Sequence, residues 1–107
     1  MPSKKPLTEK QIEQRVIDYA AHNKVLVFKF TPAGQRGWPD RLFLFDGRAM
    51  FIEFKRPGEQ PTPLQGARLN CLRASGVAAH WCCYVTTGKF IVDELINGPT
   101  VAGRRKK

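Results

Sequence analysis

Two apolar segments joined by Asp46-Gly47 constrain the fold of this chain more than any other feature of its sequence. Residues 41–45 (RLFLF) and 48–55 (RAMFIEFK) are rich in the aromatic and branched side chains that strands favour. An Asp-Gly pair between such segments is a strong signal for a two-residue hairpin turn. Both faces of the hairpin are apolar, with Leu42, Leu44 and Phe51 on one and Phe43, Phe45, Met50, Ile52 and Phe54 on the other. This pattern predicts a sheet that is covered on both sides.

Helix signals flank the hairpin. Thr8 and Gln11 form a capping-box pattern, which predicts a helix from about Glu9 to His22–Asn23. Thr62 as N-cap, Pro63 at the first helical position and Gln65 predict a second helix that ends near Ser75. The other expected elements are strands over residues 25–30 and 79–86, a loop over 31–38 (TPAGQRGW) and a short helix over 92–96.

The expected order of the main elements is therefore α-β-β-β-α-β. A strand–helix–strand crossover makes the third and fourth strands parallel, whereas the hairpin strands are antiparallel. The prediction is an α/β fold with a mixed sheet flanked by helices. A chain of 107 residues forms one domain, here residues 8–97, between basic tails at residues 1–7 and 98–107.

The hairpin register brings two acids together. If Asp46 and Gly47 are the central turn residues, Phe45 lies opposite Arg48 and Asp40 lies opposite Glu53. Lys55 lies two residues after Glu53 and shares its face. Two facing carboxylates destabilise a sheet unless a cation compensates them, and Mg²⁺ prefers carboxylates, water and phosphate oxygens. Asp40, Glu53 and Lys55 therefore suggest a metal site for phosphodiester chemistry; the alternative is a strand-end cap beside an exposed ion pair.

A further acid is expected from the first helix. Glu13 extends the apolar face that Val16, Ile17 and Ala20 form at helical spacing, so it lies at the edge of the buried stripe or points to the acid pair. Glu9, one turn earlier, competes with it, although an acid in the first turn is also favoured by the helix dipole.

The charge of +9 indicates a polyanionic partner, most simply nucleic acid. The basic residues in or near the loops around the acid pair are Arg36, Arg41, Arg48, Arg56, Arg68 and Arg73, and Trp38 lies among them. No apolar run is long enough for a membrane span, and no signal peptide is expected in the first ten residues. The three cysteines, two of them adjacent, predict buried thiols in a reducing cytoplasm and neither a disulfide framework nor a zinc site.

The stretch GWPDRLFLFDGRAMFIEFKRPGEQPTPLQ, residues 37–65, resembles the VRR-NUC family of the PD-(D/E)XK nuclease superfamily. The resemblance is to its short stand-alone form, typical of bacteriophages and prophages, and implies a restriction-endonuclease-like core. It implies that Asp40, Glu53 and the backbone carbonyl of Phe54 bind Mg²⁺ or Mn²⁺ and that Lys55 is the catalytic lysine. Glu13 then corresponds to an acid that binds the metal through water, and Gln65 to a glutamine that positions the lysine, the water or a phosphate.

The same resemblance implies a metal-dependent endonuclease that cleaves branched DNA as a homodimer, similar to Holliday junction resolvases, in the cytoplasm of a bacterial host. Arg36, Arg41, Arg56, Arg68 and Trp38 are the expected DNA contacts. Two alternatives stay open: a nucleic-acid-binding module without catalysis, and a restriction-type or nicking nuclease that acts on other DNA.

Overall fold

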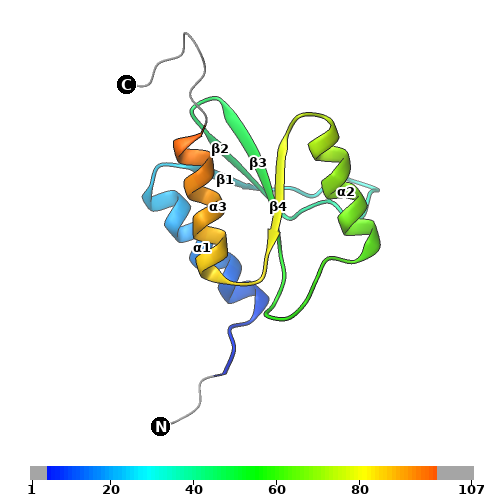
Figure 1. Ribbon diagram of the computed structural model, residues 1–107, viewed down its shortest axis with the longest axis horizontal. Helices are drawn as coiled ribbons and strands as arrows, with labels where there is room; N and C mark the ends of the chain where they lie inside the picture. The colour runs from blue at the N-terminus through cyan, green and yellow to red at the C-terminus, as the bar shows by residue number, and fades with distance from the viewer. Residues whose placement is uncertain (1–4, 99–107) are drawn as a thin grey trace.

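The computed structural model describes residues 5–98 and has a four-stranded mixed sheet between two layers of helices (Figure 1). The strands are β1 (Leu26–Lys29), β2 (Arg41–Phe45), β3 (Arg48–Phe54) and β4 (Ala78–Cys82), which lie in the order β1-β2-β3-β4. The helices are α1 (Glu9–His22), α2 (Pro63–Ala74) and α3 (Val85–Asn97). Helices α1 and α3 cover one face of the sheet and α2 covers the other, which confirms the predicted α/β fold.

Both predicted helix starts are confirmed at the level of single hydrogen bonds. The hydroxyl of Thr8 accepts from the Gln11 amide at 3.1 Å, and the Gln11 side chain accepts from the Thr8 amide at 2.9 Å. Thr62 and Gln65 make the same reciprocal pair at the start of α2, directly before Pro63. These short-range contacts satisfy amide groups that the first turn of a helix leaves without partners.

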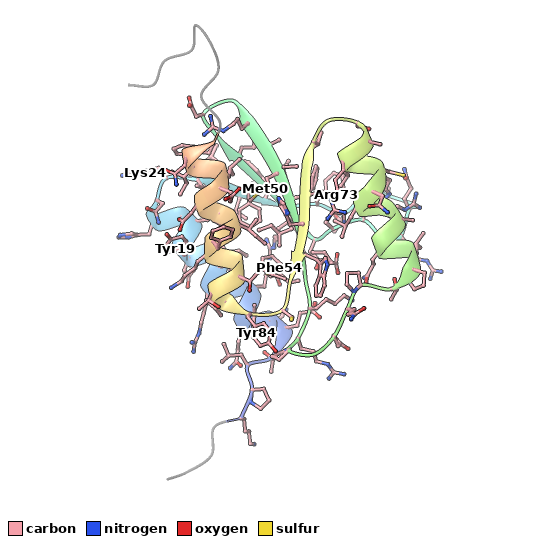
Figure 2. The ribbon with its side chains drawn as sticks, in the orientation of Figure 1. Tyr19, Lys24, Met50, Phe54, Arg73 and Tyr84 are labelled. Atoms are coloured by element: carbon pink, nitrogen blue, oxygen red, sulfur yellow. The ribbon has the colours of Figure 1, made fainter. Side chains whose placement is uncertain are left out.

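The hairpin register is also confirmed. Phe45 lies opposite Arg48 and Arg41 lies opposite Ile52, while β3 and β4 pair in parallel. The alternating side chains of the hairpin then enter two separate cores. Met50 and Phe54 point from β3 toward α3 (Figure 2), in the larger core, whereas Phe51 packs with residues of α2 and β4 on the other face.

The end of the described chain differs from the prediction. The short helix expected over residues 92–96 is α3, which already begins at Val85, and the fourth strand ends at Cys82 instead of continuing to residue 86. Residues 85–87 (VTT) are β-branched and favour a strand locally. Tertiary packing overrides that preference, because about two additional turns of helix bury Gly88 and Ile91 against the larger core. The first strand is likewise shorter than residues 25–30. Most of the predicted C-terminal tail and the first four residues of the N-terminal tail lie outside the described residues.

The cysteines are free, and they lie in three different environments. Cys82 is buried, as predicted, and burial raises the pKa of its thiol to about 12, so it is a poor nucleophile near neutral pH. Cys83 is half-buried. Cys71 is exposed on α2, so the prediction of buried thiols is wrong for this residue, because α2 turns only Leu69 fully into the core. None of the helices in the described range is long and apolar enough to cross a membrane.

We expect Gly88→Ala to destabilise the protein, because α3 packs closely against α1 at this position. A Cβ atom at residue 88 would lie 2.5 Å from Cγ2 of Val16, a fully buried and stiff side chain. Overpacking of this kind costs about 1–3 kcal/mol, more than the helix propensity that alanine adds. Gly66 in α2 is the matched control, since a Cβ there meets nothing within 4 Å and Gly66→Ala should raise stability. Urea denaturation of both variants measures the difference; a Gly88→Ala variant as stable as Gly66→Ala would contradict this packing.

Candidate active site

The predicted acid pair lies at one end of the sheet, where β2 begins and β3 ends. Asp40 directly precedes β2 and Glu53 is the penultimate residue of β3, each one residue beyond the last pair of the hairpin ladder, Arg41 opposite Ile52. The carbonyl of Asp40 accepts from the amide of Phe30 at 2.8 Å, which ties Asp40 to the end of β1 as well. Three strands thus hold the two acids at one edge.

Glu53 is the most unusual side chain of this edge. It is a charged residue with only 3% of its surface exposed, on a strand whose other buried residues are all apolar. Its Oε2 atom accepts from Nε2 of Gln65 at 3.2 Å and lies 3.9 Å from Nζ of Lys55. Its Oε1 atom has no hydrogen-bond partner, and among the described residues it is the only buried side-chain nitrogen or oxygen in that situation. An unpartnered buried oxygen is costly, so this position indicates a site that something else completes.

The electrostatics of the pair follow from burial. Burial and then the nearby Asp40 carboxylate raise the pKa of Glu53 to about 8, against a lowering effect of Lys55. Burial and then the Glu13 carboxylate raise the pKa of Asp40, which Lys55, Arg41 and Lys29 partly offset. Both carboxyl groups are therefore destabilised as anions when no cation binds between them.

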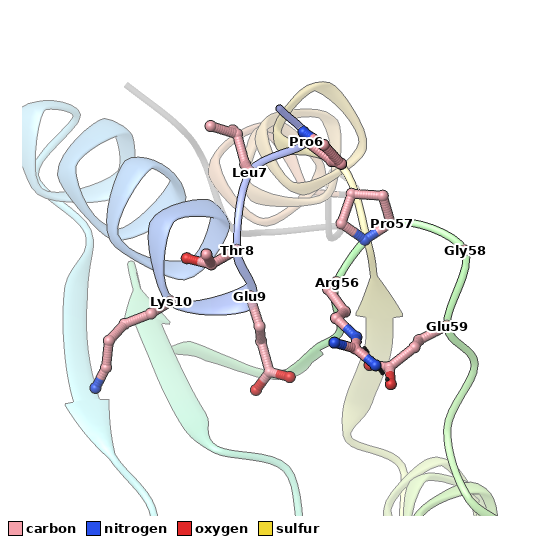
Figure 3. A pocket seen from close by; sticks show the side chains of 9 residues that line it. All are labelled: Pro6, Leu7, Thr8, Glu9, Lys10, Arg56, Pro57, Gly58 and Glu59. Atoms are coloured by element: carbon pink, nitrogen blue, oxygen red, sulfur yellow. Dashed lines mark ion pairs between the residues drawn. The ribbon is translucent and has the colours of Figure 1, made fainter. Parts of the chain in front are cut away.

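Helix α1 contributes both of its candidate acids to the surroundings of the pair, and they differ in their partners. The Oε2 atom of Glu13 accepts from Nε of Arg41 at 2.6 Å, in an ion pair that is mostly shielded from solvent. The Glu9 carboxylate makes no hydrogen bond or ion pair within residues 5–98, and burial and then Asp40 raise its pKa. Figure 3 shows the Glu9 carboxylate extending from the first turn of α1, opposite Arg56 and Glu59. The sequence prediction favoured Glu13, but Glu9 is the acid that the described structure leaves uncompensated.

Gln65 has two roles in the structure, as the capping residue of α2 that the sequence predicted and as a hydrogen-bond partner of Glu53. Its Oε1 atom accepts from the amide of Thr62 at 2.9 Å to complete the cap of α2, and its Nε2 atom donates to Glu53. The start of α2 is thereby linked to the end of β3.

The donor set fits a hard divalent cation such as Mg²⁺. Asp40 and Glu53 supply carboxylate oxygens, the Glu53 Oε1 atom lacks a partner, and a cation would favour the ionised form of both acids. Across residues 5–98 no group of three or more His, Cys, Asp or Glu side chains is arranged as a ready-made metal cage. Mg²⁺ needs none, since it commonly takes one or two carboxylates and completes its shell with water and phosphate.

The arginines of the sequence prediction differ in the partners that they have in the structure. Arg56 is paired to Glu59 at 3.1 Å on the wall of a surface pocket that Glu9 also lines (Figure 3), whereas Arg68 contacts Trp38 and the Arg36 carbonyl. Arg41 is committed to Glu13, so its predicted DNA contact competes with that ion pair. Two other arginines support carbonyl groups instead of surrounding the site: Arg48 donates to the Leu95 and Ile96 carbonyls at the far end of the hairpin, and Arg73 donates to Ala79.

Arg68 makes the most specific contacts of the group. Its guanidinium lies 4.6 Å from the centroid of the Trp38 ring, and its Nε donates to the Arg36 carbonyl at 3.0 Å. The loop of residues 31–38 is thereby attached to α2. Leu64, which the sequence analysis did not single out, belongs to the same corner; it is 43% exposed and directly precedes Gln65. The sequence signal that could have identified Leu64 was an apolar side chain among the polar residues at the start of a helix.

This chain resembles known proteins both in sequence and in fold. No protein-family profile matches it. The chain is 40% identical over 60 residues to "Putative nuclease p44" of Acyrthosiphon pisum secondary endosymbiont phage 1, and the match covers 55% of this chain and 64% of that protein. The chain therefore matches slightly less than two thirds of the length of this relative.

Two solved structures share the fold. One, named "VRR_NUC domain", superposes with a TM-score of 0.74 at 22% identity and covers 81% of this chain and 97% of its own. The other, named "VRR_NUC domain protein", has a TM-score of 0.70 at 20% identity, with 87% and 91% covered. These likenesses confirm the fold that the resemblance of residues 37–65 predicted. The chain thus has the VRR_NUC domain fold and is related in sequence to a phage protein named as a nuclease.

Proposed function

We propose that this protein is a VRR-NUC-type, metal-dependent endonuclease that hydrolyses phosphodiester bonds in DNA, with a preference for branched DNA. The observation that carries the proposal is the buried Glu53, whose Oε1 atom has no partner, at the sheet end that also holds Asp40 and Lys55. Such an arrangement costs stability in the absence of a ligand. A cation and a phosphate group would offset that cost.

The proposed metal ligands are Asp40, Glu53 and the backbone carbonyl of Phe54, and the metal is Mg²⁺ or Mn²⁺. When bound, such an ion polarises the phosphodiester and lowers the pKa of a coordinated water. Glu53 is held for this role by the amide of Gln65, which restricts the rotation of the carboxylate. Gln65 is therefore a positioning residue for the metal ligand.

Lys55 is the proposed catalytic lysine. Its ammonium group lies 3.9 Å from the Glu53 carboxylate and only 12% of its side chain is exposed, so it is held close to the acid pair. From there it orients the attacking water or balances the negative charge that develops on the phosphate. We infer direct attack by water, with no covalent intermediate on the protein.

The first helix contributes to the site through Glu9 and Glu13 in different ways. We assign the contact with the metal, through water, to Glu9, because its carboxylate has no ionic partner in the described structure. Glu13, the acid that the family resemblance favoured, instead holds Arg41 next to Asp40. If phosphate binding draws Arg41 away, Glu13 becomes available to the same site.

DNA binding is assigned to Arg36, Arg56, Arg68 and Trp38, with Arg41 as a conditional contact. The basic side chains supply a sequence-independent attraction to the phosphate backbone, which should weaken steeply as salt rises. We further propose that the protein acts as a homodimer, because one domain carries one site and symmetric cleavage of a junction needs two. Its relative in a phage favours a phage or prophage origin and action in the cytoplasm of a bacterial host.

The test of this function is a cleavage assay on end-labelled four-way junctions, nicked duplex and intact duplex, with Mg²⁺, Mn²⁺ or EDTA. We expect cleavage of the junction that disappears in EDTA and returns when Mg²⁺ is restored. Binding without cleavage under every metal condition would support the alternative of a non-catalytic module. Efficient cleavage of intact duplex at one sequence would support the restriction-type alternative.

A further inference from the structure

At the corner between the loop of residues 31–38 and helix α2, several specific side-chain contacts attach the loop to the helix. Three contacts attach the loop to the first two turns of α2. Arg68 stacks on Trp38, Arg68 also donates to the Arg36 carbonyl, and Leu64 packs against the backbone of Gly37. The loop runs alongside α2 in Figure 1.

Two contacts fix the orientation of the Trp38 ring, one over the ring and one at its indole nitrogen. The guanidinium of Arg68 lies over the ring at 4.6 Å from its centroid, and the indole nitrogen donates to Oε1 of Gln35 at 3.0 Å. The ring is only half-buried, so part of the indole remains open to solvent. A pre-oriented indole with a guanidinium stacked over it forms a layered surface on which nucleobases stack, since every base presents a flat π face.

This corner borders the proposed active site. Trp38 precedes Asp40 by two residues, Leu64 precedes Gln65, and Arg68 lies three residues after Gln65 on the same side of α2. Because Gln65 donates to Glu53, the platform and the acid pair are connected through one side chain. A nucleotide whose phosphate reaches the acid pair would therefore bring an adjacent base to Trp38.

We propose that Trp38, Arg68 and Leu64 form a base-stacking platform that holds one unpaired nucleobase beside the scissile phosphate. The site then selects DNA with unpaired or easily unstacked bases over intact duplex, in which stacking occupies both base faces. The position of the base beside a phosphate that is cleaved rests on the proposed nuclease function, whereas the stacking of the base does not. It can be tested by binding alone.

The first experiment measures the affinity of the protein for a labelled single-stranded oligonucleotide and for the matched duplex, by fluorescence anisotropy in EDTA. Trp38→Ala should weaken single-strand binding about ten-fold, the scale of one lost base stack, and change duplex binding less than two-fold. Trp38→Phe should recover most of the loss, because phenylalanine also stacks. Phe90→Ala is the control, since Phe90 is 63% exposed on α3, on the opposite face of the sheet from α2. Equal losses on both DNAs, or no loss, would overturn the proposal.

The second experiment tests whether the attachment of the loop to α2 matters, by comparing alanine substitutions at two glycines of the loop. Gly34 and Gly37 both have positive φ, 72° and 85°, so alanine strains the backbone at either position. Only at Gly37 would the new Cβ meet a neighbour, Cγ of Leu64 at 2.6 Å. Gly37→Ala should therefore lose the single-strand preference of the wild type, while Gly34→Ala keeps it. The same behaviour in both variants would count against a platform built on α2.

A spectroscopic measurement separates stacking from a merely structural role of Trp38. The sequence has two tryptophans, so Trp81→Phe leaves Trp38 as the sole emitter. Single-stranded DNA should quench its fluorescence and duplex should not; equal quenching would contradict the platform. If the wild type binds in this way but cuts no DNA with Mg²⁺ or Mn²⁺, the nuclease function fails and the platform stands. If it cuts intact duplex as fast as unpaired DNA, the platform fails and the nuclease stands.

Discussion

Asp40→Asn is expected to reduce junction cleavage about 10³-fold or more while leaving the protein folded and able to bind DNA. The asparagine preserves the shape of the side chain but removes one of the two carboxylates that are proposed to hold the metal. Loss of a single group that stabilises charge at a reacting centre costs about 10²–10³-fold in rate, and loss of a metal ligand adds to it. Single-turnover cleavage with saturating Mg²⁺ measures the effect.

Asp46→Asn is the matched control, since Asp46 is an exposed acid at the opposite end of the same strand pair. Asparagine tolerates its positive φ of 50°, so cleavage should remain at the wild-type rate. Lys55→Ala should show a loss of similar size with unchanged metal affinity, because the lysine acts on water or phosphate. Cleavage by Asp40→Asn at the wild-type rate would refute the assigned site.

The same assay separates the two acids of α1. Glu9→Gln should raise the Mg²⁺ concentration needed for half-maximal cleavage, because it removes the acid without an ionic partner. Glu13→Gln should instead weaken DNA binding or stability through Arg41, with a smaller change in the metal requirement. The reverse ranking would return the metal contact to Glu13.

Glu53→Gln is expected to stabilise the metal-free protein above neutral pH and to abolish cleavage. Burial holds the folded pKa of Glu53 near 8, above its ordinary value of 4.5, so the folded state retains a proton that the unfolded state releases. With respect to this group, wild-type stability is therefore greatest below pH 4.5 and falls by roughly 5 kcal/mol as pH rises from there through 8. Glutamine carries no such proton, so the variant should lose less stability over that range. Urea denaturation in EDTA from pH 5 to pH 9 measures the difference.

Mg²⁺ supplies the second half of this test. It should stabilise the wild type at pH 8, because it binds the ionised acids of the folded state, and it should have little effect on Glu53→Gln. Glu94→Gln is the control, since Glu94 is exposed on α3 and makes no side-chain hydrogen bond in the described structure. A wild type and a Glu53→Gln variant with parallel stability profiles would show that Glu53 ionises without cost.

Local patterns were sufficient to predict the hairpin and its register. The turn dipeptide Asp46-Gly47 sets the register, and the alternation of apolar residues along β2 and β3 assigns their two faces. The capping boxes at Thr8 and Thr62 depend on residues three positions apart, so both helix starts were visible in the sequence. The prediction that Asp40 faces Glu53 extends this register by one residue beyond Arg41 opposite Ile52.

Other features depend on contacts between residues far apart in the chain, and only the tertiary structure decided them. The β-branched start of α3 became helical because Gly88 allows close packing on α1, and Arg41 turned to Glu13 across 28 positions. The lack of an ionic partner for Glu9 within the described residues and the stacking of Arg68 on Trp38 have the same origin. The sequence alone determined which residues alternate, turn and cap, because those properties involve neighbours along the chain. Packing decided that Glu9 has no ionic partner within the described residues and that the Trp38 ring is oriented by Arg68, because burial and charge compensation arise only when distant elements meet.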